Sequence, residues 1–244
     1  MAKKDSKNPD IFGQALLDFH NDKYSEDITV ISSLTEDDEI PVPYLFRSYE
    51  EMPPLEQKAL QLANGKILDV GSCAGSHSLY LQQKNKEVKA IDVSEGAIEV
   101  CRLRGVENAE VQDFFNIKDE KFDTILMLMN GSGIVGKLKN LTHFFKHAKT
   151  LLKPDGKILI DSSDLRYLFE EDEDGGIWVN PNQYYGELSY SISYKDKTST
   201  PFDWLYIDFN SLQLAAQSNG FTCELIAEGE HFDYLAELKV SKVI

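Results

Sequence analysis

The segment KILDVGSCAGSHSLYL, residues 66–81, constrains the fold more than any other part of the chain. Ile67, Leu68 and Val70 form the short apolar run of a central strand in a parallel sheet, because such a strand is buried on both faces. Gly71 and Gly75 follow at once, and glycine allows positive φ angles and close approach of a ligand to the backbone. A strand that ends in such a turn and runs into a helix is where a doubly wound sheet binds a nucleotide-like cofactor.

The glycine pattern leaves two classes of cofactor open. The dinucleotide fingerprint needs three glycines, and the corresponding positions hold Gly71, Cys73 and Ser76, so only the first is met. In the turn of S-adenosylmethionine-dependent methyltransferases, glycines at alternate positions follow an acidic residue. Asp69, Gly71 and Gly75 resemble that turn, with Cys73 in place of the middle glycine. The resemblance to the methyltransferase turn is the closer of the two.

Two later predicted strands also end in residues that suit a nucleoside. Residues 87–92 predict a strand that closes on Asp92, whose carboxylate can accept hydrogen bonds from both ribose hydroxyls of either cofactor. Residues 109–115 predict a third strand that ends at Asp113 and Phe114, which suit an adenine amino group and an adenine face. This pair favours the methyl donor over the dinucleotide.

The order of the remaining elements extends the resemblance. Residues 122–130 predict a fourth strand, and the helix after it has apolar residues at a period of 3.6. Pro154 and Gly156 end that helix, and a fifth strand follows to residue 161. Residues 59–163 therefore resemble the class I S-adenosylmethionine-dependent methyltransferase family along their whole length.

The resemblance implies an α/β fold with a doubly wound, Rossmann-like sheet of seven mostly parallel strands. It implies the strand order 3-2-1-4-5-7-6 with the last strand antiparallel, an N-terminal cap and a β-hairpin insertion after strand 5. It also implies S-adenosyl-L-methionine as the cofactor and S-adenosyl-L-homocysteine as its product. The cofactor-binding residues expected from the resemblance are Asp69, Gly71, Ser72, Cys73, Gly75, His77, Asp92, Val93, Asp113, Phe114, Met129 and Asn130.

The length of 244 residues and a hydrophobic content of 42% fit one elaborated domain, residues 1–244. Within it we expect an N-terminal cap or lid, a cofactor-binding core, an inserted hairpin that covers the substrate, and a C-terminal helix and strand pair that complete the sheet. These parts correspond to residues 1–58, 59–163, 164–207 and 208–244.

Two segments outside the core contain the candidate acceptor contacts. Four prolines at 41–56 surround several aromatic rings and Arg47, which suits a lid but equally an anchor for the segment on the sheet. In 187–194 apolar and polar residues alternate, which predicts a strand that returns through a hairpin to residues 202–207. By resemblance this insertion lines the acceptor pocket; a dimer contact or an edge-strand cover is the alternative. The candidate substrate contacts are Tyr44, Arg47, Tyr49, Tyr184, Tyr185, Tyr190 and Trp204.

Methyl transfer requires in-line positioning, so a dedicated base is optional. Where the acceptor must lose a proton, the candidates by location are Asp161, Asp164 and His231. Asn130, directly after the fourth strand, is a candidate bridge between cofactor and acceptor, or simply the end of a strand. No metal site is expected, because the acidic run 170–174 lacks calcium-loop spacing and fits a solvated turn.

The formal net charge of −16, with no basic run longer than Lys3-Lys4, argues against nucleic acid as a partner. A small-molecule acceptor fits better. The absence of a long apolar run and of an apolar N-terminal segment predicts a cytoplasmic protein without a membrane partner. Three cysteines indicate reduced thiols, and a monomer or a homodimer is expected.

The favoured function is therefore the transfer of a methyl group from S-adenosylmethionine to a small molecule, mainly by positioning. Two alternatives remain open at this point. One is a non-catalytic binding protein with the same fold, because Cys73 and Asp155 depart from the common pattern. The other is an NAD-linked oxidoreductase, which Ser76 and the pair Asp113-Phe114 disfavour.

Overall fold

The computed structural model describes residues 9–170, 172 and 176–242. In this part of the chain the main sheet has seven strands in the order β11-β12-β7-β6-β3-β4-β5. Strand β12 is antiparallel to both of its neighbours, and the other pairs are parallel. The predicted order with a reversed seventh strand is confirmed. The strands are β3 (Lys66–Val70), β4 (Glu87–Asp92), β5 (Ala109–Val111), β6 (Phe122–Met127), β7 (Leu152–Ser163), β11 (Phe221–Glu228) and β12 (Asp233–Val240).

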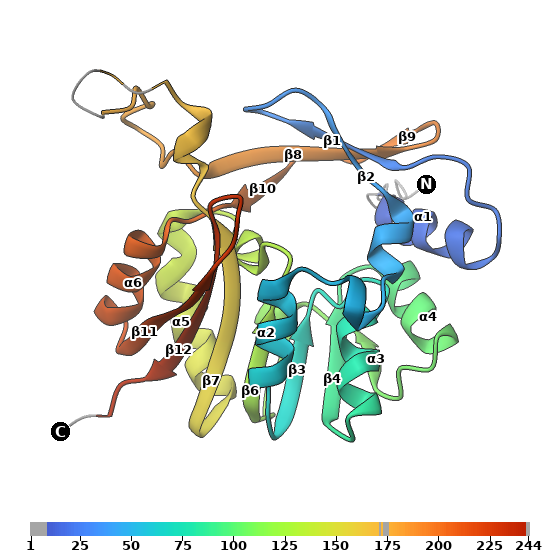
Figure 1. Ribbon diagram of the computed structural model, residues 1–244, viewed down its shortest axis with the longest axis horizontal. Coiled ribbons are helices and arrows are strands. Elements are labelled where there is room, and N and C mark those ends of the chain that lie inside the picture. The colour runs from blue at the N-terminus through green and yellow to red at the C-terminus, as the bar shows by residue number, and fades with distance from the viewer. Residues whose placement is uncertain (1–8, 171, 173–175, 243–244) are drawn as a thin grey trace, which may run out of the picture.

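Helices cover both faces of this sheet (Figure 1). Ile67 of β3 packs with residues of the helices on one face, whereas Leu68 and Val70 pack with residues of the other face. Burial on both faces is the physical reason for the apolar run in β3. One face carries α2 (Pro54–Leu62), α3 (Ser76–Gln83) and α4 (Glu95–Leu103), and the other carries α5 (Leu141–Leu151) and α6 (Phe209–Ser218).

Short 3-10 turns form much of the connecting chain. They lie in the N-terminal segment, after β5, after β6 and after β7, and so several of them follow the carboxyl ends of strands. These turns are η1 (Val42–Phe46), η2 (Tyr49–Glu51), η3 (Phe114–Asn116), η4 (Gly131–Val135), η5 (Leu138–Asn140) and η6 (Leu165–Leu168).

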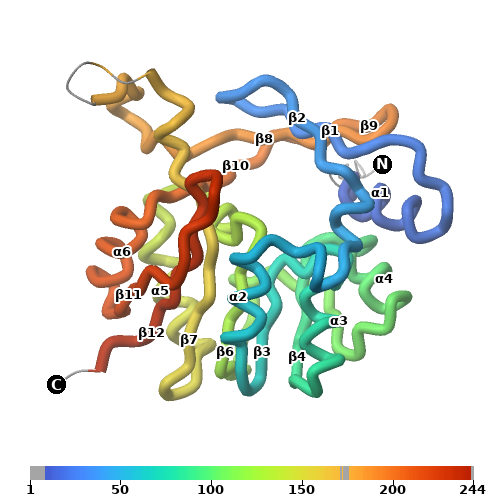
Figure 2. The backbone as a smooth tube through the Cα atoms, viewed as in Figure 1, coloured from blue at the N-terminus to red at the C-terminus, as the bar shows by residue number. Residues whose placement is uncertain are grey.

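A second, antiparallel sheet, here called the upper sheet, lies across the carboxyl ends of the parallel strands (Figures 1 and 2). Its strand order is β10-β8-β1-β2, and β9 also pairs with β8. The predicted hairpin is present as the β8–β10 pair. The pairing of β1 with β8, which joins the N-terminal segment to the insertion, was not predicted. The strands are β1 (Ile28–Ser32), β2 (Asp38–Ile40), β8 (Glu187–Tyr194), β9 (Lys197–Thr198) and β10 (Phe202–Leu205).

Helix α1 (Ile11–His20) attaches one side of the upper sheet to the core. It crosses α4 so closely that a Cβ on Gly96 would lie 2.7 Å from the backbone of Gly13. Asp10 caps α1 by accepting the Gly13 N–H, and it also accepts the Gly96 N–H at 2.8 Å. On the other side of α1, Asp18 lies 3.2 Å from the hydroxyl of Tyr194 in β8.

The junction between α5 and β7 differs from the prediction. Helix α5 ends at Leu151, before Pro154, and β7 begins directly at Leu152. The register between β6 and β7 shifts near Phe122, opposite the start of β7. A proline disfavours helical geometry in the residue before it, so the helix ends ahead of Pro154 rather than at it.

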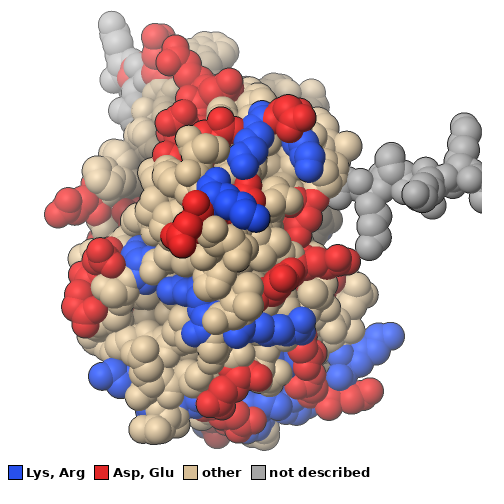
Figure 3. Space-filling view, turned by 90° about the vertical axis from the view of Figure 1, so that its right-hand side faces the viewer, with Lys and Arg blue, Asp and Glu red and all other residues tan. Residues whose placement is uncertain are grey.

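Acidic and basic side chains are interspersed on the side of the molecule shown in Figure 3. No helix in the described ranges is both long enough and apolar enough to span a bilayer. The same residues contain no group of three or more His, Cys, Asp or Glu side chains arranged to hold a metal ion. The solvated turn predicted at 170–174 lies partly outside the described residues.

Candidate active site

The loop between β3 and α3 has the backbone geometry that its glycines allow. Gly71 and Gly75 have φ angles of +72° and +81°. A Cβ on Gly75 would lie 2.9 Å from Val106 Cγ2, so packing requires glycine here as well. A Cβ on Gly71 would meet only Ile134 Cδ1, at 3.6 Å. The space in front of Gly71 is therefore open to a ligand that approaches the backbone.

Cys73 occupies the position of the missing glycine and has a φ of +52°, in the left-handed region. Its backbone N–H donates to Asp92 Oδ2 at 3.0 Å, so the loop after β3 and the end of β4 form one hydrogen-bonded unit. Burial raises the pKa of the Cys73 thiol well above its ordinary value. A protonated thiol is a poor nucleophile, so this geometry does not favour a covalent role.

Asp92 ends β4, Val93 follows it, and Asp113 lies just after β5; these are the two strands beyond β3. Asp92 Oδ1 accepts the Ser94 N–H at 2.9 Å, and burial raises the pKa of this carboxyl despite its backbone donors. Val93 is 72% exposed, and Asp113 caps η3 by accepting the Phe115 N–H. These three residues thus lie along the same sheet edge as the glycine loop.

The expectation that Phe114 offers a face to adenine is wrong. Its side chain is 3% exposed and lies in the core, with its ring centroid 5.8 Å from that of Phe144 and 5.1 Å from that of His147. The turn η3 directs Phe114 inward under α5, and Phe115 instead stacks on His143 at 5.2 Å. The sequence could not distinguish the two phenylalanines because both follow the strand end.

Met129 and Asn130, after β6, are consecutive left-handed residues with φ of 62° and 59°. Asp161 of β7 stabilises this turn, because its two carboxylate oxygens accept the N–H groups of Met129 and Gly131 at 2.9 Å each. Burial raises the pKa of Asp161 to about 7. Asp161 therefore holds the turn that presents Met129 at the carboxyl edge.

The side chain of Asn130 is hydrogen-bonded within the protein. Its Oδ1 accepts from the hydroxyl of Ser162 at 3.1 Å, and its Nδ2 lies 3.5 Å from the carbonyl oxygen of Leu205. Ser132 donates to the same carbonyl oxygen at 2.9 Å. Asn130 thus joins the end of β6 to the inserted segment, which favours a structural role over a bridge to an acceptor.

Arg47 is the clearest correction among the predicted acceptor contacts. It is 6% exposed and forms an ion pair with Glu56 of α2, rather than lying on an open lid. His77 Nε2 of α3 lies 2.6 Å from the same Glu56 oxygen. Burial raises the pKa of Glu56, but His77 and Arg47 outweigh it, so the pKa is lowered. The buried carboxylate therefore connects the cap to α3, directly after the glycine loop.

One atom of this cluster remains without a partner. Arg47 Nε is buried and has no hydrogen-bond partner among the residues that the structure describes. A buried N–H of a charged group without a hydrogen bond is costly in free energy, so such an atom marks a place where a ligand can supply a hydrogen-bond acceptor. Sequence analysis missed Glu56, because an acidic residue in the first turn of a helix ordinarily lies on the surface and stabilises the helix dipole.

Several other predicted contacts have structural partners. Tyr49 stacks on Tyr80 of α3, with ring centroids 4.0 Å apart, which supports the anchor rather than the lid. Tyr184 donates to Asp208, and Tyr185 donates to Asp164. These hydrogen bonds hold both tyrosines against residues in or next to the inserted segment. Tyr44, 40% exposed, lies with its ring 4.1 Å from the Arg47 guanidinium.

His231 and the glycine loop belong to different parts of the strand order. His231 is exposed in the turn between β11 and β12, at the opposite end of the strand order from β3, β4 and β5. Its backbone N–H donates to Asp233, one of the acidic neighbours in its own turn. Asp233 pairs with Ser163 at the end of β7, so this turn lies at the carboxyl edge of the sheet beside β7, and a role of His231 as a base stays a prediction.

Trp204 of β10 faces the carboxyl edge of the main sheet. A Cβ on Gly133 of η4 would lie 2.0 Å from Trp204 Cε2, so the indole packs directly on the backbone after β6. The upper sheet thereby contacts the carboxyl edge of the main sheet on the side opposite α1. The hydroxyl groups of Tyr190 and Tyr206 lie 3.1 Å apart on this part of the molecule.

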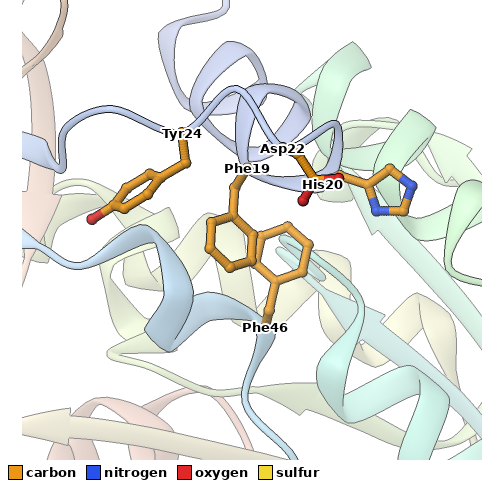
Figure 4. A pocket seen from close by; sticks show the side chains of 5 residues that line it. All are labelled: Phe19, His20, Asp22, Tyr24 and Phe46. Atoms are coloured by element: carbon orange, nitrogen blue, oxygen red, sulfur yellow. The ribbon is translucent and has the colours of Figure 1, made fainter.

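A separate hollow lies at the carboxyl end of α1 (Figure 4). It has a volume of about 480 Å³ and contains none of the strand-end residues described above. The hollow is lined by Phe19, His20, Asp22, Tyr24 and Phe46.

Comparisons with known proteins agree with this geometry. The profile of a family described as "Methyltransferase domain" matches residues 68–160. The crystal structure of a SAM-dependent methyltransferase from Bacteroides fragilis in complex with S-adenosyl-L-homocysteine is 52% identical in sequence. That match covers 96% of this chain and 95% of the other, with a TM-score of 0.89. No curated protein matches the chain.

More distant structures share the fold alone. The CcbJ methyltransferase from Streptomyces caelestis is 15% identical, with a TM-score of 0.60, and the match covers 80% of this chain and 93% of that one. DesVI from Streptomyces venezuelae is 14% identical, with a TM-score of 0.54 and coverage of 82% and 96%. The close relative, together with the strand-end geometry, identifies the chain as a member of the class I S-adenosylmethionine-dependent methyltransferase family.

Proposed function

We propose that this protein transfers a methyl group from S-adenosylmethionine to a small-molecule acceptor at the carboxyl edge of the main sheet, beneath the upper sheet. The observation that carries the proposal is the hydrogen bond from the Cys73 N–H to Asp92, which holds the glycine loop and the acid after β4 in one unit. The 52% identical relative, crystallised with S-adenosyl-L-homocysteine, supports the same cofactor here.

The residues present fit this cofactor. The open space at Gly71 accommodates a ligand against the backbone, and Asp92 is placed to accept hydrogen bonds from ribose hydroxyls. Val93, Asp113 and Met129 lie along the adjoining strand ends. The unpaired Arg47 Nε, at the other side of the loop near His77, suits a carboxylate such as that of the methionine portion.

When bound, S-adenosylmethionine supplies an electrophilic methyl group. The protein's contribution is to orient the acceptor in line with it and to exclude water, which the upper sheet and the Met129–Asn130 turn are placed to do. Asp161 acts in this scheme by fixing that turn, since both of its oxygens accept backbone N–H groups. No dedicated base is required if the acceptor reaches the site with a free lone pair.

The organisation of the chain follows the same proposal. Residues 59–163 form the cofactor core, 1–58 and 164–207 supply the cover, and 208–244 complete the sheet, all within one domain. We place the protein in the cytoplasm as a monomer or homodimer that acts on a small molecule and not on nucleic acid. The net charge of −16 supports the last point, because phosphate backbones repel acidic surfaces.

Calorimetric titration with S-adenosylmethionine, S-adenosylhomocysteine and NADH tests the proposal. We expect binding of the first two and none of NADH. Asp92→Asn is expected to weaken binding by roughly 10- to 100-fold, the scale of hydrogen bonds to a charged group. Asp196→Asn, an exposed acid between β8 and β9, is the matched control and should leave binding unchanged.

The alternatives give different results. Tight NADH binding would support an oxidoreductase and contradict the proposal. Cofactor binding without methyl transfer to any of a broad panel of amines, alcohols, thiols and carbon acids would support a non-catalytic binding protein.

A further inference from the structure

The face of the upper sheet that looks onto the main sheet is apolar and aromatic. Directly paired residues of antiparallel strands share a face, and Tyr190 of β8 is paired with Phe202 on one side and with Ser32 on the other. Trp204 is two residues from Phe202 in β10 and therefore shares this face. Because Trp204 packs on Gly133, this face looks onto the carboxyl edge of the main sheet. We call it the inner face.

The inner face is packed at its ends and accessible in its middle. Along β8, Leu188 and Tyr194 are 4% and 3% exposed, whereas Tyr190 and Ile192 between them are only half-buried. Strand β8 has neighbours on both sides, so this exposure comes through the inner face and not through a sheet edge. Trp204 is half-buried in the same way. The middle of the inner face therefore offers contact surface to a ligand above the cofactor edge.

The polar groups there are phenols, and the charges near them are acidic. The hydroxyls of Tyr190 and Tyr206 lie 3.1 Å apart. Burial raises the pKa of both phenols, and nearby acids add to it: Asp38 for Tyr190 and Asp161 for Tyr206. Both phenols are thus neutral donors and acceptors at neutral pH. Asp38 pairs with Val30, and Val30 pairs with Ile192, so Asp38 lies on the inner face. Its negative charge there disfavours an anionic ligand and favours a cation.

Two basic side chains of the surrounding segments are already paired. Arg47 binds Glu56, and Lys137 lies 3.1 Å from Asp203, which alternates with Phe202 and Trp204 and so lies on the outer face of β10. Aromatic rings with adjacent carboxylates attract ammonium groups through the ring quadrupole and through charge. Neither feature gives an advantage to an alcohol or a carboxylate of the same shape.

From this juxtaposition we infer that the acceptor is a small molecule with an amino group, which binds on the inner face against the Tyr190–Tyr206 pair and Trp204. The inference rests on the proposed methyltransferase function and names its substrate class. The bound ammonium first releases a proton to water. The neutral amine then supplies its lone pair to the methyl carbon, and the carbon–sulfur bond breaks with its electron pair left on sulfur. The proton of the methylated ammonium is released to water.

Three ligands of matched shape test the inference: benzylamine, benzyl alcohol and benzoate. Their binding to the full protein saturated with S-adenosylhomocysteine is measured by ligand-observed NMR titration. Benzylamine is expected to bind roughly tenfold more tightly than benzyl alcohol, the scale of a partly desolvated cation–π contact, and benzoate to bind most weakly.

Variants separate the phenols from the surrounding charge. The double variant Tyr190→Phe and Tyr206→Phe is expected to weaken benzylamine about fivefold while S-adenosylhomocysteine affinity stays unchanged, since one hydrogen bond is worth roughly that factor. Asp38→Asn is expected to weaken benzylamine about twofold and benzyl alcohol not at all. Tyr49→Phe, whose ring stacks on Tyr80 outside this face, is the matched control.

The outcomes are distinct. If benzyl alcohol or benzoate binds as tightly as benzylamine, or if none of the three binds saturably beside S-adenosylhomocysteine, the amine inference is overturned while the methyltransferase proposal stands. Failure of S-adenosylhomocysteine itself to bind overturns both. Benzylamine preference that is lost in the double variant and kept in Tyr49→Phe supports the inference.

Discussion

The core and the upper sheet are built by different kinds of interaction. In the core, the apolar strand, the glycine turn and helix α3 adjoin one another in the chain, so the cofactor edge arises from local signals. The upper sheet depends on β1 pairing with β8, two segments more than a hundred residues apart in sequence. A site can therefore combine a cofactor half encoded locally with an acceptor half that exists only after long-range pairing. The two halves meet where Asn130 and Ser132 contact the carbonyl oxygen of Leu205 in β10 and where Trp204 packs on Gly133.

The largest expected effect comes from breaking the Glu56 cluster. Glu56→Ala leaves the Arg47 guanidinium buried without its carboxylate, and removing one partner of a buried pair costs about 3–5 kcal/mol. We expect a loss of this size in the free energy of unfolding, measured by urea denaturation. Glu50→Ala, at an exposed acid in the same segment, is the control. A loss below about 1 kcal/mol in Glu56→Ala would show that the ion pair does not join cap and core.

The next effect concerns pH. Burial raises the pKa of Asp161 to about 7 from an ordinary value near 3.8, so the folded state keeps a proton that the unfolded state has released. Stability attributable to this group is therefore highest below pH 4 and falls as the pH rises toward 7. Asp161→Asn should remove that contribution, so its stability should fall less steeply over this range than that of the original protein. Parallel pH profiles of the two proteins would contradict the assignment.

A smaller effect should separate the upper sheet from the core. Gly133→Ala places a methyl group where the Trp204 indole lies, and overpacking of this kind costs about 1–3 kcal/mol. Hydrogen exchange should increase in β10 and β8 but stay unchanged in β3 and β4. Gly105→Ala is the control for space, because a Cβ there meets nothing within 4 Å, although its positive φ is also strained. Uniform acceleration across both sheets would show that they unfold together.

The smallest expected effect is at Cys73. Its left-handed backbone favours glycine, so Cys73→Gly should relieve about 1 kcal/mol of strain, offset in part by the lost packing of the thiol. We expect a change in melting temperature of a few degrees at most and unchanged S-adenosylhomocysteine affinity. A large loss of cofactor affinity would instead show that the thiol takes part in binding.

The sequence predicts the core well because each of its signals is local. Ile67, Leu68 and Val70 indicate burial on both faces, and the strand order follows from the family resemblance. It predicts side-chain direction poorly where two like residues adjoin, as with Phe114 and Phe115. The sequence marks Arg47 as unusual, but its partner Glu56 and the His77 that contacts the same carboxylate come from two different helices, and no spacing rule connects them. The β1–β8 pairing has the same cause, since alternation predicts a strand but not its neighbour.

The upper sheet is attached to the core at two places, so it is a fixed cover and not a hinged lid. At one attachment, α1 packs closely on α4 through Gly13 and Gly96. At the other, Trp204 packs on Gly133. A hinged lid has one fixed end, whereas the upper sheet cannot rotate unless one of these two close-packed contacts breaks. Under the proposed function, the acceptor and the product must therefore enter and leave beneath the upper sheet, from its sides. Changes in acceptor preference should accordingly arise from residues on the inner face of the upper sheet, with both attachments unchanged.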